Sequence, residues 1–148
     1  MSERFVAASG RKVVSRTSAE DLGSLARLVV DAKRRQVVSL VVGKGRKAVL
    51  IDWDQVTGFG PDAVMVADED ALHEPRDDHE REAAGGKLEL IGKRTLSDIG
   101  NDLGPVTDVV FDPDTGAIEA ISIGDREVTA DSLLGAGSFA VIIRDSGD

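Results

Sequence analysis

The chain contains two copies of one pattern, and this internal repeat constrains its fold more than any other feature. Residues 11–43 align with residues 92–124 at a constant offset of 81 positions. After a length difference in the polar turn around Lys44–Lys47, residues 54–66 align with residues 131–143 at an offset of 77. Insertions are tolerated in surface turns. The alignment therefore predicts two copies of one small β unit.

The size of each copy implies that the two depend on each other. The chain has 148 residues, which suits one domain or two very small ones. Each copy has about 55 to 65 residues, a length at which a lone hydrophobic core is marginal. With four Phe, one Trp and no Tyr, the core must be built mainly from Val, Leu, Ile and Ala. We therefore expect the copies to pack together or the chain to form a homodimer.

Composition excludes several classes of protein. No apolar run approaches the roughly 20 residues of a membrane span, and the residues after Met1 do not form the apolar segment of a signal peptide. Cysteine is absent, which excludes disulfides and thiolate metal sites. These features favour a cytoplasmic protein of bacterial type.

The net charge of −9 argues against general nucleic-acid binding, which needs a basic surface. The charge is uneven, because residues 1–72 carry 11 Lys/Arg and 10 Asp/Glu whereas residues 73–148 carry 7 and 17. The acidic part can serve solubility, attract the other copy, or face a different partner.

Hydrophobic patterning predicts antiparallel strands joined by short turns in both copies. Each copy should also contain one helical turn, at residues 53–56 and 129–134. Asp112–Gly116 is a strong hairpin signal, because Pro113 pre-sets φ and Gly116 accepts the left-handed conformation. The predicted strands cover residues 25–31, 36–42, 48–52, 63–67, 92–95, 106–112, 117–123 and 139–143.

Three segments follow from this reading: a first copy at residues 5–70, an acidic linker at 71–87 and a second copy at 88–144. The linker is charged, ends in Gly85-Gly86 and has too few apolar residues to bury itself, so we expect it to be flexible. A short helix over residues 78–84 is the alternative.

The second copy contains Gly100, Leu103, Gly104, Val106 and Asp108 in one stretch. This stretch resembles the PRC-barrel family, in which a Gly–x–x–Leu-Gly–x–Val–x–Asp pattern opens a small β barrel. The first copy is similar but degenerate, with Ala19 at the position of Gly100 and Arg27 at that of Asp108. The residues that carry the resemblance are Gly100, Leu103, Gly104, Val106, Asp108, Asp112 and Gly116, with Leu22, Gly23 and Asp31 in the first copy.

The resemblance implies an all-β fold of two small antiparallel PRC-type barrels in tandem, each with a short helical turn. Family members include the cytoplasmic part of the photosynthetic reaction-centre H subunit and the ribosome-maturation factor RimM. The resemblance therefore implies a non-enzymatic docking or adaptor domain.

Two turns of the first copy are the best candidates for partner binding. Their cations have acidic counterparts in the second copy, at Asp114 and Asp125. They could contact RNA phosphate, anionic lipid or an acidic protein, or they could be ordinary solvated turns. Trp53, the single tryptophan, could anchor a partner, or it could cap the barrel or fill the contact between the copies. The basic candidates are Lys33, Arg34, Arg35, Lys44, Arg46 and Lys47.

No residue pattern predicts catalysis, a cofactor or a metal site. Both histidines, His73 and His79, lie in the predicted linker beside carboxylates. A metal needs ligands in fixed geometry, which a flexible linker does not provide. The sequence favours a cytoplasmic protein-binding adaptor, with a homodimer as one option. The alternative is an RNA- or ribosome-associated processing factor that uses the basic turns.

Overall fold

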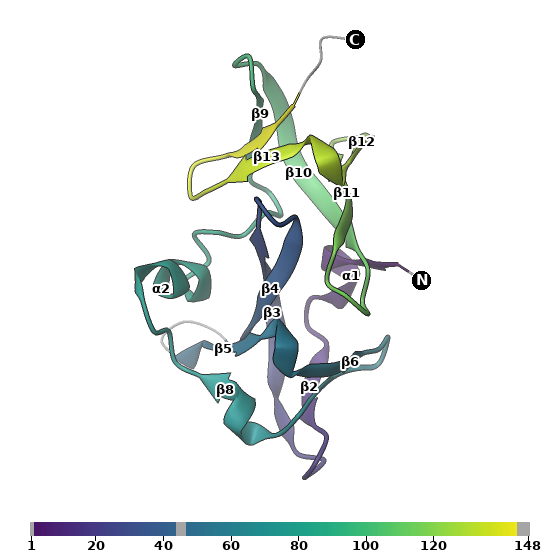
Figure 1. Cartoon of the computed structure of the whole chain (residues 1–148), viewed down its shortest axis with the longest axis vertical. Helices are drawn as coiled ribbons and strands as arrows, with labels where there is room; N and C mark the ends of the chain where they lie inside the picture. Colours follow the sequence, from purple (N-terminus) through teal and green to yellow (C-terminus); the bar gives the residue numbers. More distant parts are fainter. Residues whose placement is uncertain (1, 44–46, 145–148) are drawn as a thin grey trace.

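The computed structural model describes residues 2–43 and 47–144, and Figure 1 shows the two copies stacked along the long axis of the molecule. The first copy and the segment after it contain β1 (Glu3–Arg4), α1 (Phe5–Ala8), β2 (Lys12–Ser15), β3 (Asp21–Asp31), β4 (Gln36–Val42), β5 (Val49–Asp52), the 3₁₀ turn η2 (Trp53–Gln55), β6 (Val56–Phe59), β7 (Ala63–Val66), η3 (Glu69–Ala71), β8 (Leu72–His73) and α2 (Asp78–Ala84).

The second copy repeats the series from β2 to β7, with one strand or 3₁₀ turn for each. Its elements are β9 (Arg94–Ser97), β10 (Asp102–Phe111), β11 (Ile118–Ile123), β12 (Arg126–Thr129), η4 (Ala130–Ser132), β13 (Leu133–Ala136) and β14 (Val141–Ile143). None of the helices in the described ranges is both long and apolar enough to cross a membrane.

The strands form two sheets with the same order of pairing. The first runs β6-β7-β2-β3-β4-β5-β8, and the second runs β13-β14-β9-β10-β11-β12 with β1 added on β10. The mostly β content and the two-sheet arrangement match the expectation from sequence. The prediction of antiparallel barrels is only partly right, because β2 pairs with β7, and β9 with β14, in parallel. Each sheet also has two unpaired ends in the described part of the chain.

The register shows where the sequence alignment slips by one residue. Val13 pairs with Gly23 in the first sheet, and Thr95 pairs with Gly104 in the second. Thr95 is therefore the counterpart of Val13, one position beyond the offset of 81. The turn between the two strands is shorter by one residue in the second copy, which accounts for the shift.

Equivalent aspartates build equivalent turns in both copies. The Asp21 and Asp102 carboxylates each accept a hydrogen bond from the backbone N–H two residues later, at 2.9 Å. Those donors are Gly23 and Gly104, whose φ angles of +127° and +101° suit glycine. Asp31 and Asp112 accept in the same way at the next turn. Side-chain to backbone bonds of this kind favour turns, so these motif residues have a structural role.

One hydrophobic core is shared by the two copies. Buried side chains from both sheets, among them Leu25, Leu40, Val109 and Ile121, belong to a single cluster. This confirms the expectation that the copies pack together. A lone copy would leave one face of its sheet in water, which is unfavourable for so small a unit.

Aromatic side chains concentrate at the contact between the copies. Phe111 of β10 lies at the centre, and its ring centroid is 5.4 Å from that of Phe5, 5.2 Å from Phe59 and 6.4 Å from Trp53. The three pairs are edge-to-face, the arrangement that the ring quadrupoles favour. Four of the five aromatic residues in the chain are therefore used to join the copies.

A local two-fold relation orders this contact. Gln36 and Ala117 form an antiparallel bridge, and they occupy equivalent positions in the repeat. The Val37 N–H donates to the Gly116 carbonyl at 2.8 Å, and the Ile118 N–H donates to the Arg35 carbonyl at 2.8 Å. Exchanging the copies converts one bond into the other. The contact is isologous, like that of a symmetric dimer, but within one chain.

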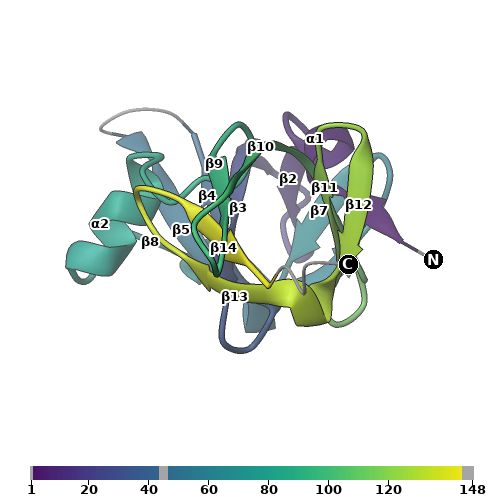
Figure 2. The ribbon, with the colours of Figure 1, turned by 90° about the horizontal axis from the view of Figure 1, so that it is seen from above.

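The predicted flexible linker is ordered and packed, which corrects the expectation for residues 71–87. β8 adds to the edge of β5, and α2 packs on the outer face of the first sheet through Ala83 and Ala84. Figure 2 shows α2 on the side of the molecule away from the N-terminal strand. The alternative, a helix over residues 78–84 that ends before Gly85, is correct. Ala83 and Ala84 alone are enough to pack the helix on the sheet, although its other face is charged. An argument from overall composition does not detect two such residues.

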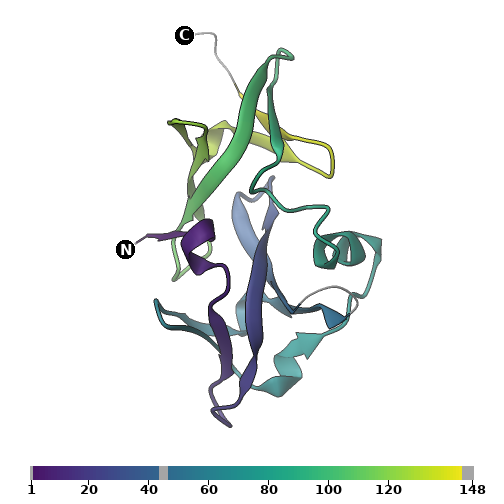
Figure 3. The same cartoon turned by 180° about the vertical axis from the view of Figure 1, so that it is seen from behind.

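The N-terminal segment crosses to the other copy. β1 pairs with β10, with Glu3 opposite Phe111, and α1 packs against the same strand, as Figure 3 shows from behind. The Val6 N–H donates to Asp108 at 3.1 Å. Asp108, a motif residue, therefore ties the start of the chain to the second sheet.

Gly116 tests this contact, because a Cβ atom there would lie 2.9 Å from Cε2 of Trp53. We expect Gly116→Ala to destabilise the protein by about 1–3 kcal/mol more than Gly124→Ala. Both glycines have positive φ, +80° and +62°, but a Cβ at Gly124 would meet nothing within 4 Å. Urea unfolding followed by Trp53 fluorescence measures both. Equal losses would show that Trp53 moves aside without cost.

Candidate functional site

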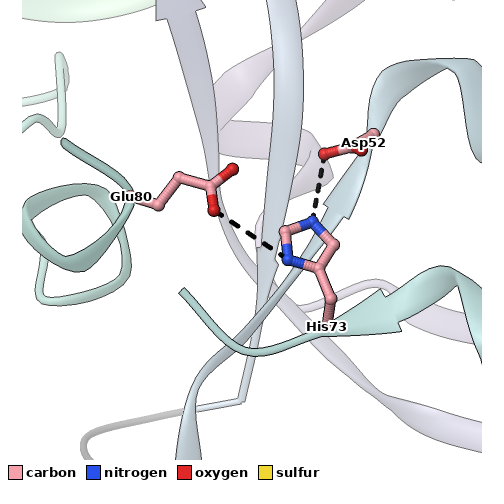
Figure 4. A group of neighbouring side chains, drawn as sticks. All are labelled: Asp52, His73 and Glu80. Carbon is pink, nitrogen blue, oxygen red and sulfur yellow. Dashed lines mark hydrogen bonds and ion pairs between the residues drawn. The ribbon is translucent and has the colours of Figure 1, made fainter. Parts of the chain in front are cut away.

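A polar cluster joins β5, β8 and α2. Figure 4 shows three of its side chains, those of Asp52, His73 and Glu80. His73 lies between Asp52 and Glu80. Its Nε2 is 3.0 Å from Asp52 Oδ1, and its Nδ1 is 4.0 Å from Glu80 Oε1. Nδ1 also lies 2.9 Å from the carbonyl oxygen of Glu74. Both ring nitrogens thus face oxygen atoms of neighbouring residues.

Arg76 completes the cluster and neutralises its two carboxylates. Its Nη2 donates to Asp52 Oδ1 at 3.0 Å and to Glu80 Oε2 at 3.0 Å. Hydrogen bonding from Arg76 holds the pKa of the Glu80 carboxyl below its usual range, and the same bond raises the pKa of Arg76. Asp77 caps the helix by accepting from the Glu80 N–H at 2.8 Å. The cluster therefore fixes α2 to the edge of the first sheet.

The geometry of a metal site is partly present here. One ligand atom each from Asp52, His73 and Glu80 lie within 4.8 Å of one another. This set differs from the loose His73–His79 group that the sequence suggested, because His79 is exposed and points elsewhere in the fold. Arg76 already supplies positive charge to both carboxylates. A cation would have to displace that guanidinium, so the cluster is better described as an ionic latch.

The predicted basic turns have different fates. Lys33 and Arg34 are exposed, and in the part of the chain that the structure describes neither forms an ion pair. Arg35 instead reaches the second copy, where its guanidinium donates to the carbonyls of Asp131 and Leu133 at 3.1 and 3.3 Å. Lys47 is exposed. Lys44 and Arg46 lie outside the described residues.

Trp53 lies at the contact between the copies. Its indole packs over Gly116 and against Phe111, and it is half-buried. It also borders a shallow hollow with Arg34 and Gln36. This placement matches the second of the two roles suggested by the sequence.

Two further hollows lie where the copies meet. One, of about 320 Å³, is lined by apolar side chains of α1, β3 and residues 89–91, with Arg27 and Glu89 on its wall. The Arg27 guanidinium donates to the Ala84 carbonyl at 2.8 Å, and its Nε lies 3.5 Å from Glu89. The other, of about 330 Å³, lies between the β3–β4 turn, α2 and β13. Arg27 thus holds the segment after α2, a role that its equivalence to Asp108 in the repeat did not indicate.

Residues 8–72 match the family model of the PRC-barrel domain. The chain contains a PRC-barrel domain. The match falls on the first copy, in which the motif is degenerate, and the structure explains how that copy keeps the turn. Ala19 has φ +61° where Gly100 has +92°, so the left-handed conformation is retained without glycine. No curated protein is significantly similar to the chain in sequence.

Sequence reasoning missed the ionic latch, because its members are far apart in the chain. Asp52 directly precedes the 3₁₀ turn η2, where an aspartate can cap a helix, but its side chain accepts no capping bond and faces His73 instead. The available signal was Arg76 four residues before Glu80, a spacing that suits an ion pair along a helix start. What brings Asp52 to them is the pairing of β5 with β8, which no local pattern reveals.

The latch predicts that α2 loosens in acid. Because the Glu80 pKa is depressed in the folded protein, its contribution is complete above the unfolded value of about 4.3 and is lost as pH falls through the lower folded value. We expect Glu80→Gln to speed amide exchange in α2 at pH 7 by about two- to fivefold, the range for a partly exposed ion pair. The acid-induced loss of protection should shrink in the same variant.

Glu82→Gln is the matched control, since it removes the same charge from the same helix. Its side chain forms no ion pair within the described ranges. Hydrogen-exchange protection factors, which correct for the intrinsic effect of pH, measure both variants. If α2 were equally protected in wild type and Glu80→Gln at pH 7, the latch would not hold the helix.

Proposed function

We propose that this chain is a non-enzymatic, cytoplasmic protein-binding adaptor that recognises an extended segment of its partner by strand addition at β12. The PRC-barrel match supports a role in protein interaction. The observation that carries the proposal is a difference between equivalent strands of the two sheets. One has its outer edge covered by the chain itself, whereas no described strand covers the outer edge of the other.

β5 and β12 occupy the same place in the two sheets. β5 pairs with β4 on one side and with β8 on the other, where Ile51 is opposite Leu72. β12 pairs with β11, and in the described part of the chain it is the last strand of its sheet. Ile51 corresponds to Val128 in the repeat. β8 on β5 is therefore an example, within this chain, of the kind of short strand that the edge of β12 would accept.

The side chains of β12 favour a different protein over a second copy. Arg126, Glu127 and Thr129 are exposed, and Val128 is half-buried. Symmetric antiparallel pairing of two β12 strands about Glu127 would place like charges opposite each other, which is unfavourable. Charged edges protect against such self-pairing. A partner strand with a basic residue opposite Glu127 would gain a cross-strand ion pair.

An RNA- or ribosome-associated role is the alternative, and its support is the exposed pair Lys33 and Arg34. Two cations beside a net charge of −9 give a small electrostatic footprint for phosphate. Arg35, the third cation of that turn, donates to the second copy. Nuclease sensitivity of the captured partner separates the two functions.

Two proline variants test strand addition at β12. Successive N–H groups of a strand point to opposite sides, so one of Glu127→Pro and Val128→Pro removes a bond to β11 and the other removes an outward donor. We expect the inward variant to be less stable, and the outward variant to unfold like wild type but to lose at least about tenfold in partner capture.

Capture uses the tagged full chain in lysate with and without nuclease, followed by mass spectrometry of the proteins retained. Lys47→Ala, an exposed site on the other copy, serves as the control and should retain wild-type capture. Hydrogen exchange on the purified complex should show new protection in β12. Undiminished capture by the stable proline variant would refute strand addition there, and a partner set lost with nuclease would favour the RNA-associated function.

A further inference from the structure

We propose a second recognition site, a groove between the β3–β4 turn, α2 and β13 that receives an aromatic side chain of a protein partner, with an acidic residue beside it. This site is separate from the β12 edge and does not depend on strand addition. It follows from the local two-fold relation between the copies. The same place is filled by aromatic rings on one side of that axis and by small residues on the other.

On the filled side, three aromatic residues meet across the contact. Phe59 at the end of β6 lies edge-to-face on Phe111, with ring centroids 5.2 Å apart. Trp53 packs on the same Phe111 ring at 6.4 Å. Phe59 and Phe111 are 8% and 0% exposed. The pocket formed by β6 and the β10–β11 turn is therefore occupied by the chain itself.

On the other side, each of these positions carries a small residue. Phe59 corresponds to Ala136, Phe111 to Val30 and Trp53 to Ala130, by the two offsets of the repeat. Val30 and Ala136 lie together on the wall of one groove, as the two-fold relation requires for the counterparts of a contacting pair. Val30 is half-buried and Ala136 is exposed. Because Val30 and Ala136 stand where the other side has Phe111 and Phe59, the groove is open where the other side has a packed core.

The groove has the size and the surface that suit a ring. Its volume is about 330 Å³, and Val30, Val38, Leu134 and Ala136 supply apolar walls, while Asp31, Lys33 and His79 supply polar ones. Leu134 is 38% exposed, so part of its side chain is open to an incoming ring. An aromatic residue buries about 150–250 Å² when it is enclosed. The apolar walls continue directly from the contact between the copies, so an inserted ring would extend an existing interface.

The basic residues beside the groove favour an acidic residue next to the aromatic residue of the partner. Lys33 lines the groove and Arg34 follows it in the same turn, and the described residues offer neither an ion pair. Asp31 also lines the groove, and its carboxylate accepts from the backbone N–H groups of both residues, which orients the turn. The complementary partner is a peptide segment with Asp or Glu next to Trp or Phe.

The test uses a defined peptide and the methyl NMR signals of the full chain. The probe is N-acetyl-Glu-Trp-Glu-amide, and N-acetyl-Glu-Ala-Glu-amide is its control. We expect the tryptophan peptide to shift the methyl signals of Val30, Leu134 and Ala136 in a saturable manner. The alanine peptide should not shift them, and the Val128 methyl signals on β12 should stay unchanged with either peptide.

Ala136→Phe supplies the matching variant, because it restores the residue found at the equivalent position of the first copy. The new ring should occupy the groove and weaken binding of the tryptophan peptide at least about tenfold, with circular dichroism unchanged since Ala136 is exposed. Thr57→Phe, an exposed site on β6, should bind the peptide as wild type does. Lys33→Glu should weaken binding of the acidic peptide by about two- to fivefold and leave binding of N-acetyl-Gly-Trp-Gly-amide unchanged.

Three outcomes would overturn the proposal that the groove binds an aromatic residue. They are no saturable shift at Val30 and Ala136, equal shifts with the alanine peptide, or equal affinity of wild type and Ala136→Phe for the tryptophan peptide. Each leaves strand addition at β12 untouched, because that function is read from the proline variants. Conversely, loss of the β12 function would not change the peptide titration. Failure of one site is therefore distinguishable from failure of the other.

Discussion

The contact between the two copies is the constraint on which the rest of the structure depends. Each sheet is too small to bury its own apolar face, and the shared core begins where Phe111 of one copy meets Phe59 and Trp53 of the other. Two equivalent backbone hydrogen bonds, through Val37 and Ile118, fix the orientation of the sheets. Burial supplies the free energy and the paired bonds supply the geometry. Elements that differ between the copies are then added to this frame.

Those additions make a symmetric frame into an asymmetric molecule. β8 and α2 cover the edge of β5, and the ionic latch of Asp52, His73, Arg76 and Glu80 holds them there. On the second sheet, β1 instead covers part of β10 and leaves β12 at the end. A repeat protein with fully equivalent copies would present two similar surfaces. Here one copy covers its own edge, whereas in the described part of the chain no strand pairs with the outer edge of β12.

How far sequence predicts this molecule depends on how local each feature is. The turns at Asp31 and Asp112 and the 3₁₀ turn at Trp53 follow from neighbouring residues, and the structure has them in place. The parallel pairing of β2 with β7 depends on strands about 50 residues apart, for which alternating hydrophobic patterns carry no direction. α2 was underestimated because its charged face dominates the composition, although Ala83 and Ala84 are buried. The sequence predicted Arg35 to be free to bind a partner. Its acceptors are two carbonyls of the other copy, which no sequence pattern identifies.

The repeat itself is the most informative guide to function, once the structure shows which positions face each other. A comparison of copies within one chain holds fold and environment nearly constant, so a change from Phe59 to Ala136 has few structural explanations. Overpacking does not account for it, because Ala136 is exposed while Phe59 is buried. A simple loss of core residues would also be expected to close the gap by collapse of the neighbouring walls. The groove instead stays open between the β3–β4 turn, α2 and β13, and Arg35 of that turn donates to carbonyls of the second copy. An open groove with apolar walls and a few polar groups is what a recognition site requires.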